Sequence, residues 1–419
     1  MRIDDGKVEY FEKSLIINIL LCLYVASVYL FSYLEKYNMI SNSIMAVLCG
    51  SIIYYLLFKC NGGRVYFDKT LGFYTLFVGI CMASITYSTY RNSAIEQVRT
   101  LVLIWIMIFV LYNYLINTKN DKILIYALAI GGLVYSVYVI MYYGISGYYD
   151  LLISGERAGA DITNVNTIGM ISSNAFVLSI YFAMFKKKYY FYAISVVPLI
   201  TAFGSGSRKA LVAVIMSVAL LIFLKYKNNK SFFSFFKMIA LAFFVIVIFY
   251  YLLSLPAFET IVKRFDGLIN SLTGKGKAEG SAVLRENMIK YGFLEFKNHI
   301  FLGHGINNSK IVTMKYFGRS TYLHNNYVEL LFDVGIVGFA AYYAMFVYLF
   351  KSLFALLRKK VEYSEILLIL IFIHLIMNYG MVAYYSKETY VLILAAAVFV
   401  KLNETKKEDV NYEQAVKSN

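Results

Sequence analysis

The chain has 419 residues, of which 60% are hydrophobic and only 16% are charged. Its mean hydropathy is +0.63 and its formal net charge is +15. Soluble domains have an apolar fraction of about 45–50%, so this composition excludes an ordinary soluble enzyme, a disordered protein and a disulfide scaffold. We expect an all-α integral membrane protein in which the excess Lys and Arg orient the chain, without nucleic-acid binding.

Apolar runs of about 17–25 residues, the length that crosses a bilayer core, recur along the chain. Only two prolines occur, Pro198 and Pro256, so most of these runs should form unbroken helices. We predict about twelve transmembrane helices, at 14–34, 40–58, 71–88, 100–117, 123–144, 165–185, 189–204, 209–225, 237–255, 327–350, 363–383 and 388–402.

The distribution of basic residues predicts the orientation. With the N-terminus inside, the inside segments hold 23 of the 40 Lys and Arg, and the short outside loops hold 7. Lys186–Lys188 is the clearest inside marker. Because short cytoplasmic loops are enriched in Lys and Arg, both termini are predicted to be cytoplasmic.

The remaining 10 basic residues lie in one long loop, which this orientation places outside. Two stretches of the loop, Phe258–Leu272 and Val283–Phe296, have the spacing of amphipathic helices, and Gly274–Ser281 resembles a hinge between them. The predicted division is transmembrane helices 1–9 over 1–255, a large extracytoplasmic loop over 256–326, helices 10–12 over 327–402 and a cytoplasmic tail over 403–419.

His324 lies where the long loop re-enters the membrane, and a histidine can act as a base near neutral pH. An interfacial histidine without a catalytic role is equally compatible with the pattern.

Arg208 lies in the turn between the seventh and eighth predicted helices, where small residues and a helix start would suit an anion. The alternative there is an arginine that extends to the interface.

Arg157 lies in the short outside loop before the sixth predicted helix, and Arg285 lies on the second loop helix. Either could be a solvated surface charge. Glu329 and Asp333 are four residues apart and share a helix face, which suits acid–base work, cation binding or charges that face water or an arginine. His374, inside the 363–383 run, is expected to pack rather than to relay protons.

His299 and His304 would form a metal site with His324 only if carboxylate or cysteine ligands stood at suitable spacing. The sequence has no such spacing, so we expect no metal and no other cofactor.

Four sets of residues follow a recognisable order. The first set begins at the histidine where the loop re-enters the membrane. Its pattern is a histidine, then either Asn or Ser, then nine residues, a glycine, two residues and a second glycine. The chain matches this pattern at His324, Asn325, Gly335 and Gly338. Tyr327 and Glu329 match the tyrosine and acidic residue that usually follow. The second set is the Ser205–Arg208 turn, and the third is Arg285 followed by Phe301–Gly305. The fourth is Arg157 with Gly159, followed by Asn164–Asn166. This last stretch has no proline between its two asparagines, where one is usual.

Together these motifs resemble the O-antigen polymerase and O-antigen ligase superfamily of bacterial surface-polysaccharide assembly, and their order covers nearly the whole chain. The resemblance implies an inverting, metal-independent membrane glycosyltransferase without a nucleotide-sugar donor. Its donor would be an oligosaccharide linked to polyprenyl (undecaprenyl) diphosphate, and its partners would include membrane lipids. Its site would face outward from the bacterial cytoplasmic (inner) membrane.

The resemblance also implies roles for single residues. Arg208 first, then Arg157 and Arg285, would bind the diphosphate, because arginine can hold phosphate through two N–H groups. His324 would be the catalytic base that removes the proton of the acceptor hydroxyl, and Glu329 would orient or tune it. With Arg208 stabilising the leaving diphosphate, the predicted catalytic residues are His324, Arg208 and Glu329.

Several alternatives stay open. A polymerase extends lipid-linked repeat units into O-antigen or capsular polysaccharide, whereas a ligase transfers the glycan to lipid A-core; we favour the polymerase. A transporter of lipid-linked oligosaccharides has a similar helix layout, but its ionisable residues usually lie at mid-membrane. A membrane acyltransferase is a further alternative. The sugar, and whether a chain-length regulator binds, are not readable from the sequence.

Overall fold

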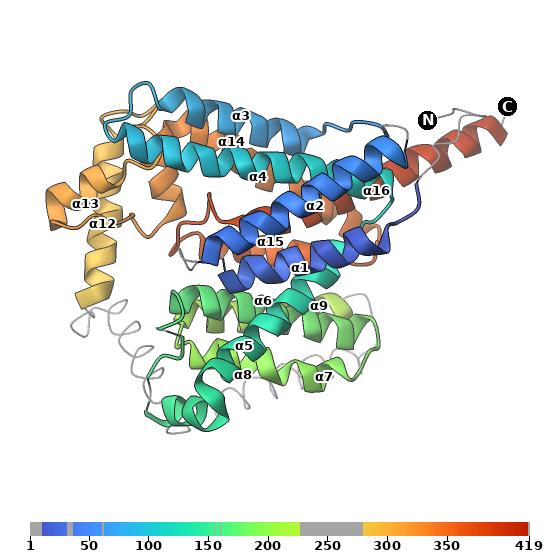
Figure 1. The fold of residues 1–419 in the computed structure, drawn as a ribbon, viewed down its shortest axis with the longest axis horizontal. Helices are drawn as coiled ribbons and strands as arrows, with labels where there is room; N and C mark the ends of the chain where they lie inside the picture. The colour runs from blue at the N-terminus through green and yellow to red at the C-terminus, as the bar shows by residue number, and fades with distance from the viewer. Residues whose placement is uncertain are drawn as a thin grey trace. The chain divides into compact units, whose positions relative to one another are not determined.

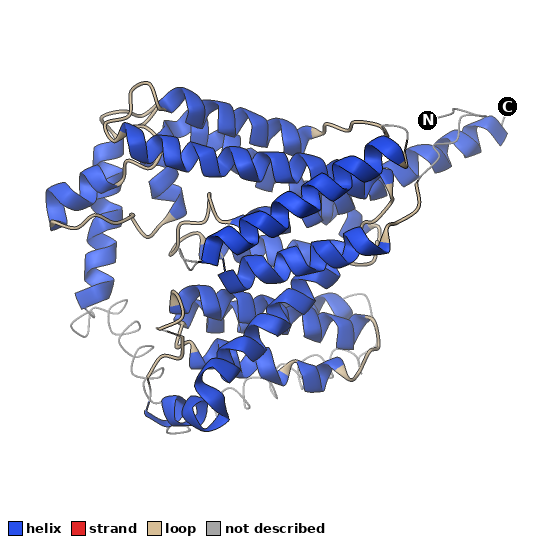
Figure 2. Cartoon of the chain, viewed as in Figure 1, coloured by secondary structure: helices blue, strands red, loops and turns tan. Residues whose placement is uncertain are grey.

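The computed structural model describes residues 11–31, 37–60, 63–154, 156–159, 161–226 and 280–417. Every regular element in this part of the chain is a helix (Figure 2). In chain order the helices are α1 (Leu15–Phe31), α2 (Asn38–Phe58), α3 (Lys69–Ser84), α4 (Arg91–Asn117), α5 (Ile123–Ser154), α6 (Val165–Phe185), α7 (Phe191–Ile194), α8 (Val196–Gly204), α9 (Arg208–Tyr226), α12 (Gly280–Phe296), α13 (Lys310–Phe317), α14 (Asn326–Arg358), α15 (Ser364–Met377) and α16 (Lys387–Lys417) (Figure 1).

Six of these helices, α2, α4, α5, α6, α9 and α14, are long and apolar enough to cross a bilayer. Shorter apolar helices, including α1, α3 and α15, coincide with further predicted spans. The prediction of an all-α multi-pass membrane protein is confirmed. The predicted span at 237–255 and the predicted loop helix at 258–272 lie outside the described residues.

Pro198 explains why the predicted run at 189–204 is divided into two helices. Proline has no N–H, and its ring crowds the carbonyl group four residues earlier, which belongs to Ile194. Accordingly, α7 ends at Ile194 and α8 begins at Val196.

The chain forms two compact units. Unit 1 comprises 1–21, 43–125 and 280–419, and unit 2 comprises 22–42 and 126–279. In unit 1, α14 packs against α3, α12, α15 and α16, which makes it the central helix (Figure 1). Aromatic rings fill these contacts: Phe77 of α3 lies against Tyr342 of α14, with ring centroids 5.1 Å apart.

In unit 2, α6 is the central helix and is almost entirely buried against α7, α8 and α9. Small residues allow this close approach. A Cβ added to Gly169 of α6 would lie 2.7 Å from the Cβ of Ala210 on α9. Such contacts are typical of membrane helices, whose association depends on close packing.

The structure describes the predicted long loop from residue 280 onward. Residues 280–325, which precede α14, are called the loop segment below. Its helices α12 and α13 pack on α14 around a small apolar core, so the predicted helix at Val283–Phe296 is confirmed as α12. Because α12 begins at Gly280, the last two residues of the predicted Gly274–Ser281 hinge are helical. The core consists of Met288, Val312, Leu323, Val328 and Phe332.

Two long helices are kinked at a glycine with positive φ. In α5 the kink is at Gly144 (φ 70°), and in α14 it is at Gly335 (φ 64°). Glycine adopts this conformation without the steric cost that a Cβ brings. The α5 kink lets the helix continue to Ser154, so the predicted outside loop after residue 144 is helical in its first part.

The kink of α14 is also a docking point for the loop segment. A Cβ on Gly335 would lie 2.2 Å from the carbonyl oxygen of Phe301, and one on Gly303 would lie 2.5 Å from that of Asp333. The two backbones can approach this closely only because both positions are glycine. Four backbone hydrogen bonds join them: the N–H groups of Ile336, Val337, His304 and Gly305 donate to the carbonyl oxygens of Ile300 (2.9 Å), Phe301 (3.3 Å), Phe332 (2.9 Å) and Asp333 (2.8 Å).

This packing predicts different costs for two glycine substitutions. Gly335→Ala and Gly318→Ala both place a Cβ on a positive-φ residue, a strain of about 1 kcal/mol. At Gly318 the Cβ meets nothing within 4 Å, whereas at Gly335 it collides with the Phe301 carbonyl. Gly335→Ala should therefore lower the melting temperature in detergent by clearly more than Gly318→Ala. Equal shifts would contradict the docking.

Candidate active site

His324 occupies a strained position immediately before α14. Its φ is +58°, in the left-handed region that residues other than glycine adopt uncommonly. The next residue, Asn325, is the N-cap of α14, and its side-chain oxygen accepts the N–H groups of Tyr327 (2.9 Å) and Val328 (3.1 Å). The His324 side chain is half-buried and lies beside Tyr322, with ring centroids 4.3 Å apart. Strain of this kind is often kept at functional sites.

Glu329 fixes the same turn from inside α14. Its side chain is buried, and Oε2 accepts the N–H of Leu323 at 2.7 Å, directly before His324 in the chain. The Ser309 hydroxyl is a further partner of this carboxylate. The structure therefore links the Glu329 carboxylate to the backbone directly before His324.

Asn326 ties the His324 turn to the connection between α15 and α16. Its side-chain oxygen accepts the N–H groups of Ala383 (2.8 Å) and Tyr384 (3.0 Å), and its amide donates to the Tyr343 hydroxyl (2.9 Å). A fully buried Asn with these partners is a satisfied structural group. The His-Asn-Asn sequence thus combines a strained histidine, a helix cap and an internal anchor.

Asp333 is a structural anchor as well. It is fully buried, and its two carboxylate oxygens accept the N–H groups of Asn307 (2.9 Å) and Asn308 (3.0 Å). The Tyr384 hydroxyl lies 3.4 Å from Oδ2. Of the alternatives for Glu329 and Asp333, the one in which they face water or an arginine is wrong, because both are buried and accept backbone N–H groups of the preceding loop.

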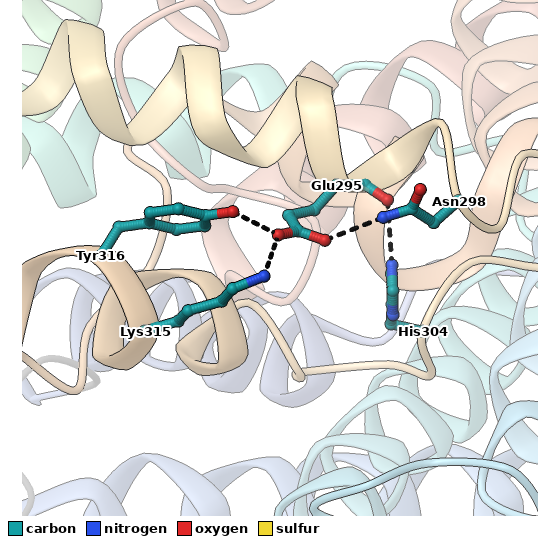
Figure 3. Close-up of polar contacts among 5 residues, drawn as sticks. All are labelled: Glu295, Asn298, His304, Lys315 and Tyr316. Carbon is teal, nitrogen blue, oxygen red and sulfur yellow. Dashed lines mark hydrogen bonds and ion pairs between the residues drawn. The ribbon is translucent and has the colours of Figure 1, made fainter.

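A second polar cluster joins α12, α13 and the turns between them (Figure 3). Glu295 Oε1 accepts hydrogen bonds from Lys315 Nζ (2.6 Å) and the Tyr316 hydroxyl (2.5 Å), and Oε2 accepts one from Asn298 (2.9 Å). The Glu295 carbonyl oxygen lies 3.2 Å from His304 Nε2, which must carry the proton in that bond.

His304 packs rather than exposing a free imidazole. Its ring stacks on Phe332, with centroids 4.2 Å apart, and lies 4.5 Å from the His299 ring. Burial lowers the pKa of His304, which favours its neutral form.

His374 also packs, with its buried ring stacked on Phe346 at a centroid distance of 5.6 Å. Arg285 is exposed on α12.

In unit 2, Arg208 begins α9 and is half-buried. The turn before it is held by Arg157, whose Nε and one terminal nitrogen donate to the carbonyl oxygens of Ser205 (3.2 Å) and Gly206 (3.1 Å). Ala158 N–H donates to the Gly204 carbonyl at 2.9 Å. The guanidinium of Arg157 thus shapes the turn that presents Arg208.

The Asn164–Asn166 element meets the same turn. Asn164 caps α6 by accepting the Asn166 N–H at 3.0 Å, and the Asn166 side chain accepts a hydrogen bond from the Ser207 hydroxyl at 3.0 Å. Two motif elements that are about forty residues apart in the sequence therefore form one cluster within unit 2.

The residues predicted for the site fall into two groups, one in each unit. Unit 1 contains His324, Glu329 and Arg285, and unit 2 contains Arg157 and Arg208. Sequence reasoning missed Glu295, whose partners lie about twenty residues away on another helix. It also missed Asn307 and Asn308, although paired asparagines are a turn signal that could have indicated them.

The fold is that of an all-α multi-pass membrane protein. Residues 193–343 match the family model described as O-antigen ligase. The matched segment includes Arg208, Arg285, His324 and Glu329, and it confirms the predicted resemblance to the O-antigen polymerase and ligase superfamily. A comparison with curated proteins found no match.

The Glu295 cluster predicts a pH-dependent contribution to stability. Hydrogen bonds from Lys315 and Tyr316 lower the Glu295 pKa below its usual range of about 4.3. A lowered folded-state pKa stabilises the fold above the ordinary value and loses that effect as the pH falls through the lowered value. The melting temperature of the wild type should therefore exceed that of Glu295→Gln at pH 6, and the difference should shrink below about pH 4.

The matched control is Glu286→Gln, an exposed change on the same helix. It should leave the melting temperature unchanged at both pH values. A wild-type advantage over Glu295→Gln that persists undiminished at pH 3 would contradict the prediction.

Proposed function

We propose that the protein polymerises polyprenyl-diphosphate-linked oligosaccharide repeat units into O-antigen or capsular polysaccharide. The observation that carries the proposal is the His324 turn, in which a strained histidine is fixed by Asn325 and Glu329 inside a segment that matches the O-antigen ligase family. A rigid turn of this kind suits a base that must meet an acceptor hydroxyl.

In the proposed reaction, an acceptor hydroxyl attacks the anomeric carbon of the lipid-linked donor. The new bond joins the acceptor oxygen to that carbon, and the bond from the carbon to the diphosphate oxygen breaks. His324 takes the hydroxyl proton, and the polyprenyl diphosphate leaves with the bonding electrons. A single displacement of this type inverts the anomeric configuration.

Arg208 is assigned to the diphosphate, because a guanidinium can stabilise the charge that develops on the leaving group. Arg157 supports that role by its hydrogen bonds to the Ser205 and Gly206 carbonyl oxygens, and it could add positive charge. Arg285, exposed on α12, is proposed as a further diphosphate ligand. Glu329 is assigned the orienting role that its contact with Leu323 supports.

A ligase remains the second candidate, because the matching family model is described as O-antigen ligase. It would use the same donor chemistry and differ in its acceptor, a lipid A-core sugar in place of a lipid-linked repeat unit. Both versions place the reaction at the outer face of a bacterial cytoplasmic membrane.

His324→Ala should abolish glycan extension, because no other group is assigned to take the acceptor proton. The assay uses purified protein in phospholipid vesicles with lipid-linked repeat units, and products are resolved by length. The matched control is His299→Ala, an exposed histidine of the same loop segment, which should keep full activity. Extension by His324→Ala at the wild-type rate would remove this residue from the mechanism.

Arg208→Ala should reduce extension by at least about 100-fold, the scale on which loss of one preorganised charge-stabilising donor acts. Arg208→Lys should recover little of the loss, because an ammonium lacks the planar fork of a guanidinium. Lys209→Ala, the neighbouring cation, should remain active. Rescue by Arg208→Lys to wild-type activity would show that a point charge is sufficient.

A further inference from the structure

An exposed apolar surface lies where the loop segment meets the kink of α14. Phe301 is 72% exposed, Leu302 is 54% exposed and Ile300 is 44% exposed. On α14, Ile336 and Val337 are 46% and 43% exposed. Because the N–H groups of these two residues donate to the carbonyl oxygens of Ile300 and Phe301, the two stretches form one continuous surface, called the tip patch below.

The tip patch continues the exposed apolar side of α14. Between 326 and 334, before the kink, every α14 residue is buried or half-buried. After the kink, exposed apolar residues recur at helical spacing along one side of the helix. These residues are Ile336, Ala340, Val347 and Phe354.

The length of α14 is compatible with a membrane boundary at the kink, which would shift this span from the predicted 327–350 to 336–358. Residues 336–358 alone reach about 34 Å at about 1.5 Å per residue, which is enough for a hydrocarbon core of about 30 Å. Basic residues follow at the other end, Arg358–Lys360, as expected for the cytoplasmic side. Residues 326–334 would then stand outside the hydrocarbon, and the tip patch would lie at its outer edge.

The surroundings of the tip patch suit an interface between water and lipid. Tyr87, which is 40% exposed, donates its hydroxyl to the Leu302 carbonyl oxygen at 2.7 Å. Lys297 is exposed, and its Nζ lies 5.7 Å from the centroid of the exposed Phe293 ring. Tyrosine and lysine beside apolar groups are typical of this boundary, where their polar ends reach the headgroups.

We propose that the tip patch inserts into the outer phospholipid leaflet and holds the loop segment at the membrane surface. The proposal rests on the proposed function in one respect only, namely that this side of the membrane is the outer side. Its consequence for that function is a fixed position of the base relative to the membrane surface. About 14 Å of helix separates Gly335 from Asn326, and His324 lies two residues before Asn326. The substrate class is then a glycan whose diphosphate lies at the headgroup level of the same leaflet.

Tryptophan fluorescence can test the insertion, because the chain contains a single tryptophan, Trp105. In a Trp105→Phe background, Phe301→Trp introduces a probe in the tip patch, and Leu302→Trp repeats the measurement. Ser320→Trp, at an exposed polar site of the loop segment, is the matched control. The proteins are reconstituted in phosphatidylethanolamine–phosphatidylglycerol vesicles whose acyl chains carry bromine near the headgroups.

We expect the brominated lipids to quench the Phe301→Trp and Leu302→Trp probes by at least about twofold more than the Ser320→Trp control. Aqueous acrylamide should show the reverse order. Quenching of the tip probes by acrylamide alone would mean a solvated surface and would overturn the proposal. Protection from both quenchers would mean that protein covers the patch, such as a second copy, and would also overturn it.

The fluorescence readout is independent of catalysis. If lipid quenching holds while the wild-type protein extends no glycan, the proposed function fails and the insertion stands. If extension holds while lipid quenching is absent, the function stands and the insertion fails.

Discussion

The architecture of unit 1 depends on one contact, the docking of residues 300–305 on the kink of α14. Two glycines, Gly303 and Gly335, allow the backbones to meet, and four hydrogen bonds close the contact. The buried Asp333 then binds the two following amides of the loop. Buried backbone groups need partners, so this contact determines where the rest of the loop segment can lie against the helix.

The motif residues divide into two kinds by their contacts. The glycines, the cap Asn325 and the anchor Asn326 hold the backbone in place around His324, which has a positive φ. In unit 2 the same division holds, since Arg157 fixes the turn carbonyls and Arg208 begins the next helix. In each cluster, hydrogen bonds hold the backbone turn next to the residue that the proposed function assigns to the reaction.

The length of the apolar runs predicted the helices well because a membrane span needs a long apolar run whatever its neighbours are. It did not predict the extension of α5 beyond Gly144, because that depends on the backbone conformation at one residue. The break between α7 and α8 was also not predicted, although Pro198, which accounts for it, is visible in the sequence. His324 and Arg208 were found as polar residues at predicted helix starts. The burial of Asp333 and the partners of Glu295 could not be found, because both result from tertiary contacts between segments.

The central claim, that the protein extends lipid-linked glycans, is tested most directly by deleting its gene in the native host. Lipid-linked and surface polysaccharides are then separated by length. We expect the ladder of long chains to disappear and a single repeat unit to remain on the final acceptor. Long chains retained on the lipid carrier would indicate a ligase, and an unchanged surface profile would contradict the account.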